Sequence, residues 1–529
     1  VLAVQMARYD GTTDGKSVSS GFYSNGKRYI VTVCSTCLTW SSNENSMSAF
    51  NIPLREILCF KHSEKDAASC FGKSPKNSSQ ASFSSLDNLI SKSIKSKILI
   101  YYGHRQGKHK WRVKTLKLKP TESGNIQAWL NCLEKSLNRL ECRPRKLLVF
   151  INPFGGQGYG ESIYHKKVKP LFKMAGIETE DIVTVRAMHA KDYLLTSSLY
   201  GIDGVISVGG DGMFSEILNG FLMRGNDKVV NDVTYEELKE IRLGYIPAGS
   251  TDAIANGTHG TVDVVTAALH IVFGNIMLHR DMHYSIFLGD TLAIDICSIF
   301  HKDKFLKYSS MFHGYGYFGE TLKRSERYRW LGPHRYDLAG VVQFISNTNF
   351  EGKVSMLSAL NNMTNPLQYG DRCTSGCDIC AKSAIKVEMG EPVQEEVNGK
   401  FLAINGLNAP CKCRHAKQGL SPSAHLGDGN LDLVLVHKTS RFNNLRYLFR
   451  SAVYPGSQFK LPFVEVHRVK EFTFTPGGQR NQSAWNCDGE LILEPSLTIR
   501  NNHQLVKVFA RGIEDHKTSA SDCDTHQLC

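Results

Sequence analysis

The sequence predicts a multidomain protein of the α/β plus β class: an N-terminal β domain, a doubly wound parallel-sheet lobe and a C-terminal antiparallel β-sandwich lobe. A strand, a glycine-rich loop and a helix recur three times between residues 143 and 278, which is typical of a parallel sheet with helices on both faces. From residue 279 onward, strand-like runs predominate, among them 463–469, 472–475 and 491–499. We therefore place the domains at 1–142, 143–278 and 279–512, followed by a polar tail at 513–529.

The first 142 residues alternate short β-like runs with polar turns. Strands are expected at Tyr29–Val33, Ile98–Tyr102 and Trp111–Leu116, where β-branched and aromatic residues are frequent. An amphipathic helix is expected at 125–140, where apolar residues recur with helical spacing. These residues are Ile126, Trp129, Leu130, Leu133 and Leu137. Several strands closed by one Trp-bearing helix resemble a pleckstrin-homology domain, and the resemblance implies membrane targeting.

Basic charge is concentrated in this N-terminal region. Residues 1–142 contain 21 Lys and Arg against 10 Asp and Glu, a net charge of +11, whereas the remainder carries +2. Four basic residues alternate and are expected on one face of a strand: Lys108, Lys110, Arg112 and Lys114. The excess of positive charge favours binding to an anionic membrane surface or to phosphoinositides. The alternative is a domain that carries many surface lysines and binds neither. Nucleic acid is not expected, because no base-reading motif is present.

Composition excludes several other classes of protein. Hydrophobic residues make up 41% and charged residues 21% of the 529 residues, which is ordinary for a globular chain. The 15 cysteines are an odd number in a long chain, so we expect free thiols in a reducing, intracellular compartment. No apolar run is long enough to predict a transmembrane span. Because the chain begins with Val1, the sequence leaves open whether the N-terminus is complete.

Three glycine-rich loops follow strand-like runs in the middle of the chain. The pairs are 146–151 with Asn152, Pro153, Phe154, Gly155 and Gly156; 205–208 with Gly209, Gly210, Asp211 and Gly212; and 243–246 with 247–252. Ligands of parallel sheets bind outside the carboxyl ends of the strands, where all three loops are expected. Together they favour a cradle for a nucleotide triphosphate over three ordinary turns.

The second of these loops gives the strongest chemical signal. Its glycines let the backbone approach phosphate oxygens, and the helix that follows presents free N–H groups to them. Asp211 is the carboxylate of this loop and suits a general base in phosphoryl transfer. The alternative is a strand-to-helix turn in which Asp211 caps the helix.

Two carboxylates flank a glycine near the C-terminus. In Asp488-Gly489-Glu490, a tight turn places both acids where they can hold Mg²⁺ on nucleotide phosphates. The alternative is a hairpin turn between exposed strands.

The cysteines also form a cluster. Cys373, Cys377 and Cys380 are followed about thirty residues later by Cys411 and Cys413. Four thiolates with loop spacing suit a tetrahedral Zn²⁺ site, and we expect Cys373, Cys377, Cys380 and Cys413 as its ligands. His415 is an alternative ligand; a redox pair or free thiols are alternative interpretations of the cluster.

Residues 441–450 form a short basic amphipathic stretch. Such a stretch docks calmodulin or a membrane. The alternative is a helix that packs its apolar face on the neighbouring sheet.

The three loops and Glu216 resemble the lipid kinase superfamily that contains the diacylglycerol and sphingosine kinases. Within it, the chain is most similar to the ceramide kinases. Four features carry this similarity: the pleckstrin-homology-like start, the segment Gly314–Glu320 with 325–332, the CxxxCxxC cluster, and the segment 483–490. The resemblance implies ATP-dependent phosphorylation of the primary hydroxyl of ceramide.

The resemblance also implies roles for individual residues. The ATP contacts would be Asn152, Pro153, Phe154, Gly155, Gly156, Thr184, Glu216, Arg329, Arg335, Asp488, Gly489 and Glu490. Gly209, Gly210, Asp211 and Gly212 would lie at the substrate hydroxyl, with Asp211 as general base. The cation would be Mg²⁺ or Ca²⁺, and calmodulin would bind at 441–450. Leu322 stands where sphingosine kinases carry a head-group carboxylate, which suits an N-acyl lipid.

The resemblance implies an enzyme associated peripherally with membranes from the cytoplasm. The alternatives are a sphingosine or diacylglycerol kinase and a non-catalytic phosphoinositide-binding adaptor. Leu322 and the cysteine cluster disfavour the sphingosine kinase. The adaptor is disfavoured because Asp211, Glu216 and Asp488 are intact.

Overall fold

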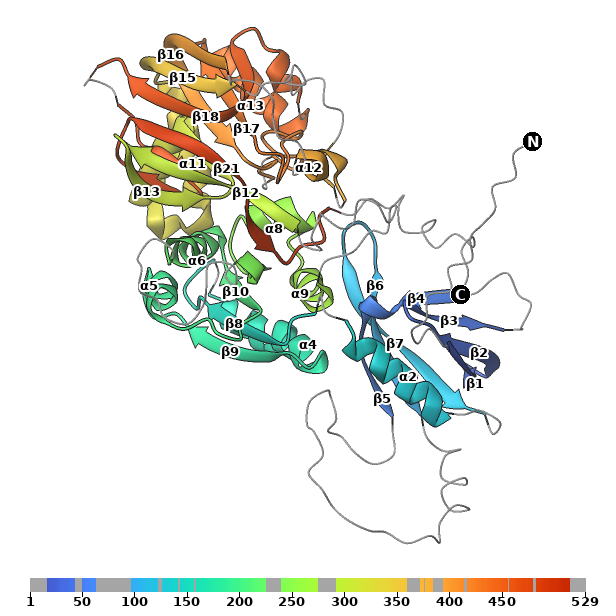
Figure 1. Cartoon of the computed structure of the whole chain (residues 1–529). Helices are drawn as coiled ribbons and strands as arrows, with labels where there is room; N and C mark the ends of the chain where they lie inside the picture. The colour runs from blue at the N-terminus through green and yellow to red at the C-terminus, as the bar shows by residue number, and fades with distance from the viewer. Residues whose placement is uncertain are drawn as a thin grey trace, which may run out of the picture.

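The computed structural model describes residues 17–42, 50–62, 97–121, 126–140, 143–156, 158–224, 239–274, 292–358, 372–374, 376–383, 393–412, 416–454, 456–478 and 482–513. The N-terminal domain stands beside a lobe of mixed helices and strands, and a β-rich lobe rises from the other end of that lobe (Figure 1). The expected tail therefore lies outside the described residues, apart from its first residue. No described helix is long and apolar enough to cross a membrane.

The N-terminal domain is an antiparallel sheet of order β4-β3-β2-β1-β7-β6-β5 with one helix packed on it. Its elements are β1 Val18–Ser24, β2 Lys27–Val33, β3 Cys37–Ser41, β4 Phe50–Pro53, η1 Leu54–Glu56, β5 Ile57–His62, β6 Ile98–Arg105, β7 Trp111–Pro120 and α2 Ile126–Asn138. The expected apolar stripe of α2 is confirmed, since Trp129, Leu130, Leu133 and Leu137 are buried. The Trp129 indole donates to the carbonyl of Val31 at 3.0 Å.

The expected basic face of the third strand is wrong in part. Lys108 and Lys110 lie in the turn between β6 and β7, and only Arg112 and Lys114 lie on β7. Gly107 and His109 in that turn have positive φ values of 73° and 57°, which an extended strand does not allow.

The middle lobe is doubly wound, as expected. Its elements are β8 Lys146–Ile151, α3 Gly160–Ile163, η2 Tyr164–Val168, α4 Lys169–Met174, β9 Glu178–Val183, α5 His189–Thr196, β10 Gly204–Gly209, α6 Asp211–Met223, β11 Arg242–Pro247, α8 Ala253–His259 and α9 Val264–Phe273. The strands run parallel in the order β11-β10-β8-β9. One face of this sheet packs on α5 and α6, and the other on α4 and α9. The carboxyl ends of β8, β10 and β11 therefore share one edge.

The C-terminal lobe is mostly antiparallel. Its elements are β12 Leu292–His301, β13 Lys304–Ser309, β14 Phe312–Gly316, α10 Tyr317–Ser325, η3 Glu326–His334, α11 Arg335–Ser346, β15 Phe350–Ser358, α12 Asp378–Ser383, β16 Val393–Leu407, β17 Leu431–His437, α13 Arg441–Val453, η4 Ser457–Lys460, β18 Val464–Pro476, β19 Trp485–Cys487, β20 Glu490–Ile492 and β21 Leu497–Val508. The long strands β16 and β18 each pair with β15 through one half and with β17 through the other. They join two layers around a core rich in aromatic side chains.

Contacts tie the three parts together. β21 pairs with β18 and β12 and also, at Val508, with Leu243 of β11, so one sheet continues from lobe to lobe. The N-terminal domain docks on α9 through β7. There the Arg112 guanidinium donates to both carboxylate oxygens of Asp263, at 2.6 and 3.1 Å.

Candidate active site

The three glycine loops meet at the common edge of the parallel strands, and their backbones touch. A Cβ built on Gly156 would lie 2.4 Å from the carbonyl oxygen of Ala248, and one built on Gly249 would lie 2.5 Å from the Cα of Gly210. Gly156 also has a φ of +63°. Only a residue without a Cβ allows the backbones to come this close. Because side chains are absent at these positions, the backbone N–H groups of the loops can face a bound ligand.

The first loop is shaped by its own asparagine. The Asn152 Oδ1 accepts hydrogen bonds from the N–H groups of Phe154 and Gly155, at 2.9 and 3.0 Å, so the chain turns sharply after β8. The ring of Phe154 is 72% exposed. Thr184 follows β9 and is buried, with its hydroxyl donating to the carbonyl of Ile151 at 3.3 Å. Thr184 therefore lies beside the root of this loop.

Asp211 is the first residue of α6 and is held by the start of α8, directly after the third loop. Its carboxylate accepts from the N–H groups of Ala253 and Ile254, at 3.0 and 3.1 Å. The hydroxyl of Tyr245 lies 3.4 Å away and donates to Asp252 at 2.6 Å.

The surroundings of Asp211 bring its pKa close to neutrality. Burial is the largest effect and raises the pKa, the two N–H groups lower it, and the negative charges of Asp252 and Asp488 raise it again, to about 6. At neutral pH the group is thus mostly a carboxylate that accepts a proton readily.

Other expected site residues serve local contacts around the cradle. Glu216 of α6 accepts from the N–H of Ala190 at 2.8 Å and so ties α6 to α5. Arg329 of η3 and Arg335 of α11 both pair with Glu326, the latter at 3.5 Å. The Arg329 side chain is largely exposed.

The Asp488-Gly489-Glu490 turn connects β19 and β20, and its two carboxylates differ. Asp488 is buried, and both of its oxygens accept hydrogen bonds. The donors are the N–H groups of Ser310, Met311 and Phe312 and the Ser310 hydroxyl, at 2.5–3.1 Å. Glu490 is more exposed and pairs with Lys307 at 2.5 Å. Asp488 thus holds the turn between β13 and β14, whereas the side chain of Glu490 is partly exposed to solvent.

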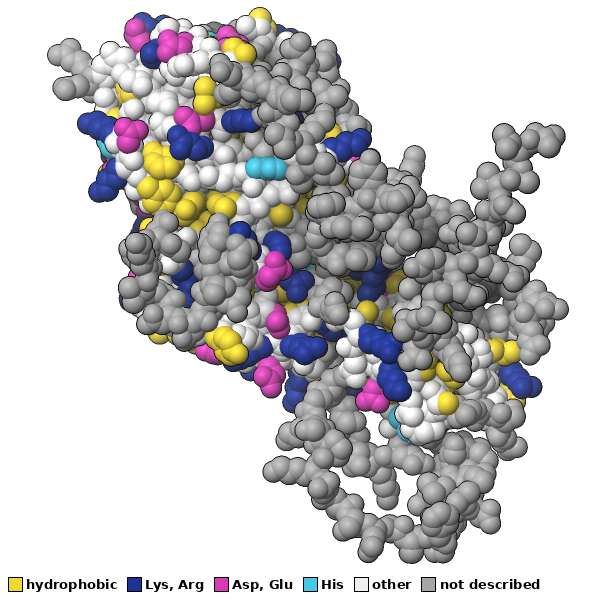
Figure 2. All heavy atoms as spheres, in the orientation of Figure 1, with side chains coloured by type: hydrophobic (Ala, Val, Ile, Leu, Met, Phe, Trp, Pro, Cys, Tyr) yellow, Lys and Arg dark blue, Asp and Glu magenta, His cyan; other side chains and the backbone are white. Residues whose placement is uncertain are grey.

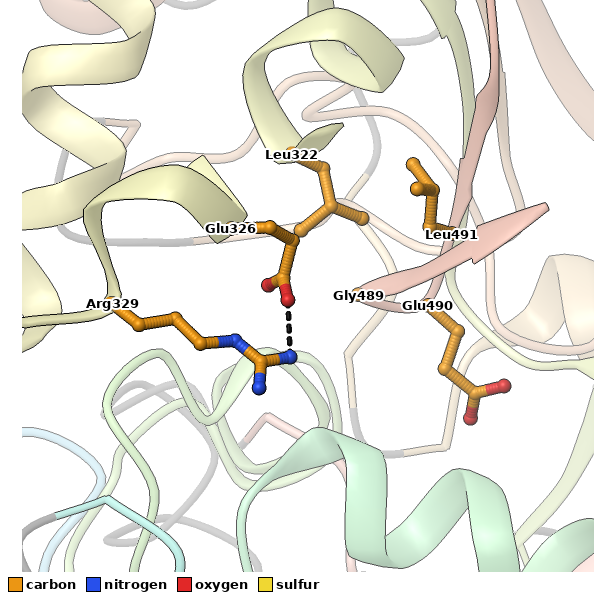
Figure 3. A pocket seen from close by; sticks show the side chains of 6 residues that line it. All are labelled: Leu322, Glu326, Arg329, Gly489, Glu490 and Leu491. Carbon is orange, nitrogen blue, oxygen red and sulfur yellow. Dashed lines mark hydrogen bonds and ion pairs between the residues drawn. The ribbon is translucent and has the colours of Figure 1, made fainter. Parts of the chain in front are cut away.

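A pocket of about 380 Å³ lies between η3 and this hairpin. Its lining residues are Leu322, Glu326, Arg329, Gly489, Glu490 and Leu491. Figure 3 shows Leu322 and Leu491 at one end, while Arg329 reaches from η3 towards the side of Glu490. The pocket therefore has an apolar end and a charged end.

The cysteine cluster lies on other elements. Cys373, Cys377 and Cys380 come together as expected, and His425 joins them. Cys413 and His415 lie outside the described residues.

Sequence reasoning missed His425, Tyr245 and Lys307. The Lys307 Nζ donates to the hydroxyl of Ser215 at 3.1 Å and also to the carboxylate of Glu490. Lys307 therefore bridges α6 and the β19–β20 hairpin. Lys307 and His425 come from segments distant in sequence from their partners, so no local spacing signals them. Tyr245 lies in β11, directly before the third loop, and its hydroxyl reaches Asp252 only seven residues later.

Comparisons with known proteins agree over most of the chain. Family models match residues 18–133 as a ceramide kinase PH domain, 146–280 as a diacylglycerol kinase catalytic domain, and 308–526 as a ceramide kinase C-terminal domain. Ceramide kinase from Homo sapiens is 40% identical over 457 residues, covering 78% of this chain and 82% of the relative. Ceramide kinase from Arabidopsis thaliana is 30% identical, covering 73% and 76%. A crystal structure of a diacylglycerol kinase from Bacillus anthracis is 16% identical, covering 69% of this chain and 97% of that one, with a TM-score of 0.44.

Proposed function

The chain belongs to the ceramide kinase family and is a kinase that phosphorylates ceramide with ATP and a divalent cation, and we propose that Asp211 is the general base of this reaction. The observation that carries the proposal is the meeting of three glycine loops beside the Asp211 carboxylate, whose pKa is raised. Phosphoryl transfer needs positioning and charge neutralisation above all, and a backbone cradle with one base offers both.

In the proposed step, Asp211 takes the proton from the primary hydroxyl of ceramide. The hydroxyl oxygen then forms the new bond to the γ-phosphorus of ATP, and the bond to the bridging oxygen breaks to leave ADP. The N–H groups of Ala253 and Ile254 keep the carboxylate oriented. Gly209, Gly210 and Gly212 would lie at the hydroxyl, and the space beside Gly212 is open.

The nucleotide is proposed to lie along the first loop. Asn152, Pro153, Phe154, Gly155 and Gly156 would line the phosphates and base, next to Thr184. Glu216 would reach the ribose, and Arg329 and Arg335 would neutralise phosphate charge. These roles come from the family resemblance and fit the cradle that the loops leave open.

The divalent cation is proposed to be Mg²⁺, with Ca²⁺ as an alternative. Glu490 and Gly489 lie at the charged end of the pocket, and a carboxylate oxygen suits either hard cation. When bound, the cation would neutralise phosphate charge. Asp488 contributes through position, because its oxygens already hold the β13–β14 turn.

The lipid is proposed to enter beside Leu322. Leu322 and Leu491 give the pocket an apolar end, and position 322 itself carries no carboxylate, which suits an N-acyl lipid that lacks a free amine. A band of hydrophobic side chains also lies between the two lobes on the face shown in Figure 2.

Two docking partners complete the proposal. An anionic membrane or phosphoinositides would bind the basic N-terminal domain, giving a cytoplasmic, peripherally membrane-associated enzyme. Calmodulin would bind α13, which packs Tyr447 inward but leaves Phe442 76% exposed, with Leu445 and Phe449 also exposed. A structural Zn²⁺ at the cysteine cluster is proposed as an ion that takes no part in the reaction.

The test is transfer of labelled phosphate from Mg-ATP to ceramide, sphingosine and diacylglycerol in mixed micelles. Label on ceramide alone supports the proposal. Label on another lipid would assign the chain that substrate while keeping the mechanism. No transfer by folded protein, with Ca²⁺ and calmodulin also supplied, would favour a membrane adaptor.

A further inference from the structure

Three cysteines and one histidine converge in the C-terminal lobe. The Sγ atoms of Cys373, Cys377 and Cys380 and a ring nitrogen of His425 all lie within 4.8 Å of one another. The separations are 3.8 Å for Cys373 Sγ to Cys380 Sγ, 3.2 Å for Cys377 Sγ to His425 Nδ1 and 3.9 Å for Cys380 Sγ to His425 Nδ1.

These separations match the edges of a zinc tetrahedron. With Zn–S near 2.3 Å and Zn–N near 2.0 Å, tetrahedral geometry gives roughly 3.8 Å between two sulfurs and roughly 3.5 Å between sulfur and nitrogen. A disulfide requires an S–S distance of about 2.05 Å, and all three cysteines are free.

We propose that Cys373, Cys377, Cys380 and His425 bind one structural Zn²⁺, and that the ion fastens a buried irregular loop to α12. Three thiolates and an imidazole are soft donors that select zinc over magnesium or calcium. Four protein ligands leave no open coordination position, so the site is structural.

His425 takes the place expected for Cys413. The neighbouring Cys411 points elsewhere, since its thiol donates to the carbonyl of Met311 at 3.2 Å. His425 belongs to the 416–430 loop between β16 and β17, far along the chain from the cysteines.

That loop needs a fastening because it is buried without regular structure. The buried residues of the loop include Ala424, His425, Leu426 and Asp428. Its backbone is held by hydrogen bonds, among them bonds from side chains, instead of by a regular β-ladder. The carbonyl of Gly427 accepts from the Ser383 hydroxyl of the α12 segment and from the Gln504 side chain of β21, at 3.0 and 2.8 Å. The ion would cross-link the same two segments that Ser383 joins.

The loop follows closely in sequence the residues Asn408 and Cys411, which contact the turn that holds Asp488. The N–H of Asn408 and the thiol of Cys411 both donate to the Met311 carbonyl, at 3.0 and 3.2 Å. The N–H of Met311 in turn donates to Asp488 at 3.0 Å. This inference deepens the structural-ion part of the proposed function, and loss of zinc is expected to loosen the Asp488 turn.

The test measures the metal content of the full-length chain, purified without a polyhistidine tag. We expect one zinc per chain in the wild type and in Cys413→Ser, and a large loss in Cys380→Ser and His425→Ala. His425→Cys should retain the ion, because a thiolate replaces the imidazole. His437→Ala, a surface histidine on β17 that pairs with Glu465, is the matched control and should keep its zinc.

X-ray absorption at the zinc edge identifies the ligand atoms in the wild-type protein, so the test does not depend on whether a variant folds. Three sulfur ligands and one nitrogen ligand are expected. Zinc-free folded wild type, four sulfur ligands, or a Cys413→Ser protein without zinc would each overturn the proposal. Thermal shifts with Mg-ATP on the same preparations separate the two ideas, since zinc without nucleotide binding would contradict the kinase proposal alone.

Discussion

The contact between the second and third glycine loops makes Gly249 the most sensitive small residue of the site. In Gly249→Ala the new Cβ would lie 2.5 Å from the Cα of Gly210 and 2.7 Å from an oxygen of Asp252. Ordinary contact begins near 3.4 Å, so the loops must separate by about 0.9 Å. Asp252 is fixed by Tyr245 and does not yield easily.

A displacement of about 1 Å at reacting groups costs on the order of 100-fold in rate. We therefore expect Gly249→Ala to lower kcat for ceramide phosphorylation by about 100-fold, while the protein stays folded and loses about 1–3 kcal/mol of unfolding free energy to the overpacked loops. Steady-state assays in mixed micelles and thermal melts measure the two quantities.

Gly257→Ala is the matched control in the same lobe. Gly257 lies within α8, and its new Cβ would meet only Met311 atoms, at 3.8 Å. This variant should keep wild-type kcat and gain up to about 1 kcal/mol in unfolding free energy, since alanine favours a helix. A folded Gly249→Ala protein with wild-type kcat would refute the reasoning.

Three further predictions follow from particular contacts. Because burial raises the pKa of Asp211 to about 6 and the base must be ionised, kcat/KM should fall as pH decreases through 6, to roughly a tenth at pH 5; a flat profile from folded protein would contradict this. Asp488→Asn should lower the unfolding free energy by about 3 kcal/mol, because a carboxylate with four donors is replaced, whereas Glu490→Gln should cost less than about 1 kcal/mol; equal losses in urea denaturation would argue against the contrast. Arg112→Ala should speed hydrogen exchange at the start of α9, where Asp263 caps the helix, and Lys114→Ala on the same strand should not; unchanged exchange in both would show that the ion pair does not hold the domains together.

The sequence anticipated the parts whose signals are local. The apolar runs before the three glycine loops became β8, β10 and β11, because buried parallel strands read as continuous hydrophobic stretches. The stripe of α2 followed from its 3.6-residue period.

Elements that depend on distant neighbours were less predictable. The two strands expected at 463–469 and 472–475 form the single strand β18, since the polar residues Lys470 and Glu471 lie on a partly exposed part of it. The strand expected at 491–499 is wrong: the chain leaves β20 at Ile492 and enters β21 at Leu497. Pro495 lies between them and cannot donate to a ladder.

The same limit applied to the site. The loops and Asp211 were visible as motifs, whereas the burial of Asp488 depends on β14 and the approach of His425 depends on a loop between β16 and β17. No spacing rule in the sequence predicts the contact of Asp488 with β14 or the approach of His425 to the cysteines.

Asp211→Asn in a single-turnover assay tests the central claim most directly. The substitution removes a carboxylate whose burial disfavours its charge, so the variant should stay folded and its melt should still shift with Mg-ATP. We predict that it transfers no labelled phosphate to ceramide above background, whereas the wild type does. Transfer at the wild-type rate by folded Asp211→Asn protein would contradict the assignment of the general base.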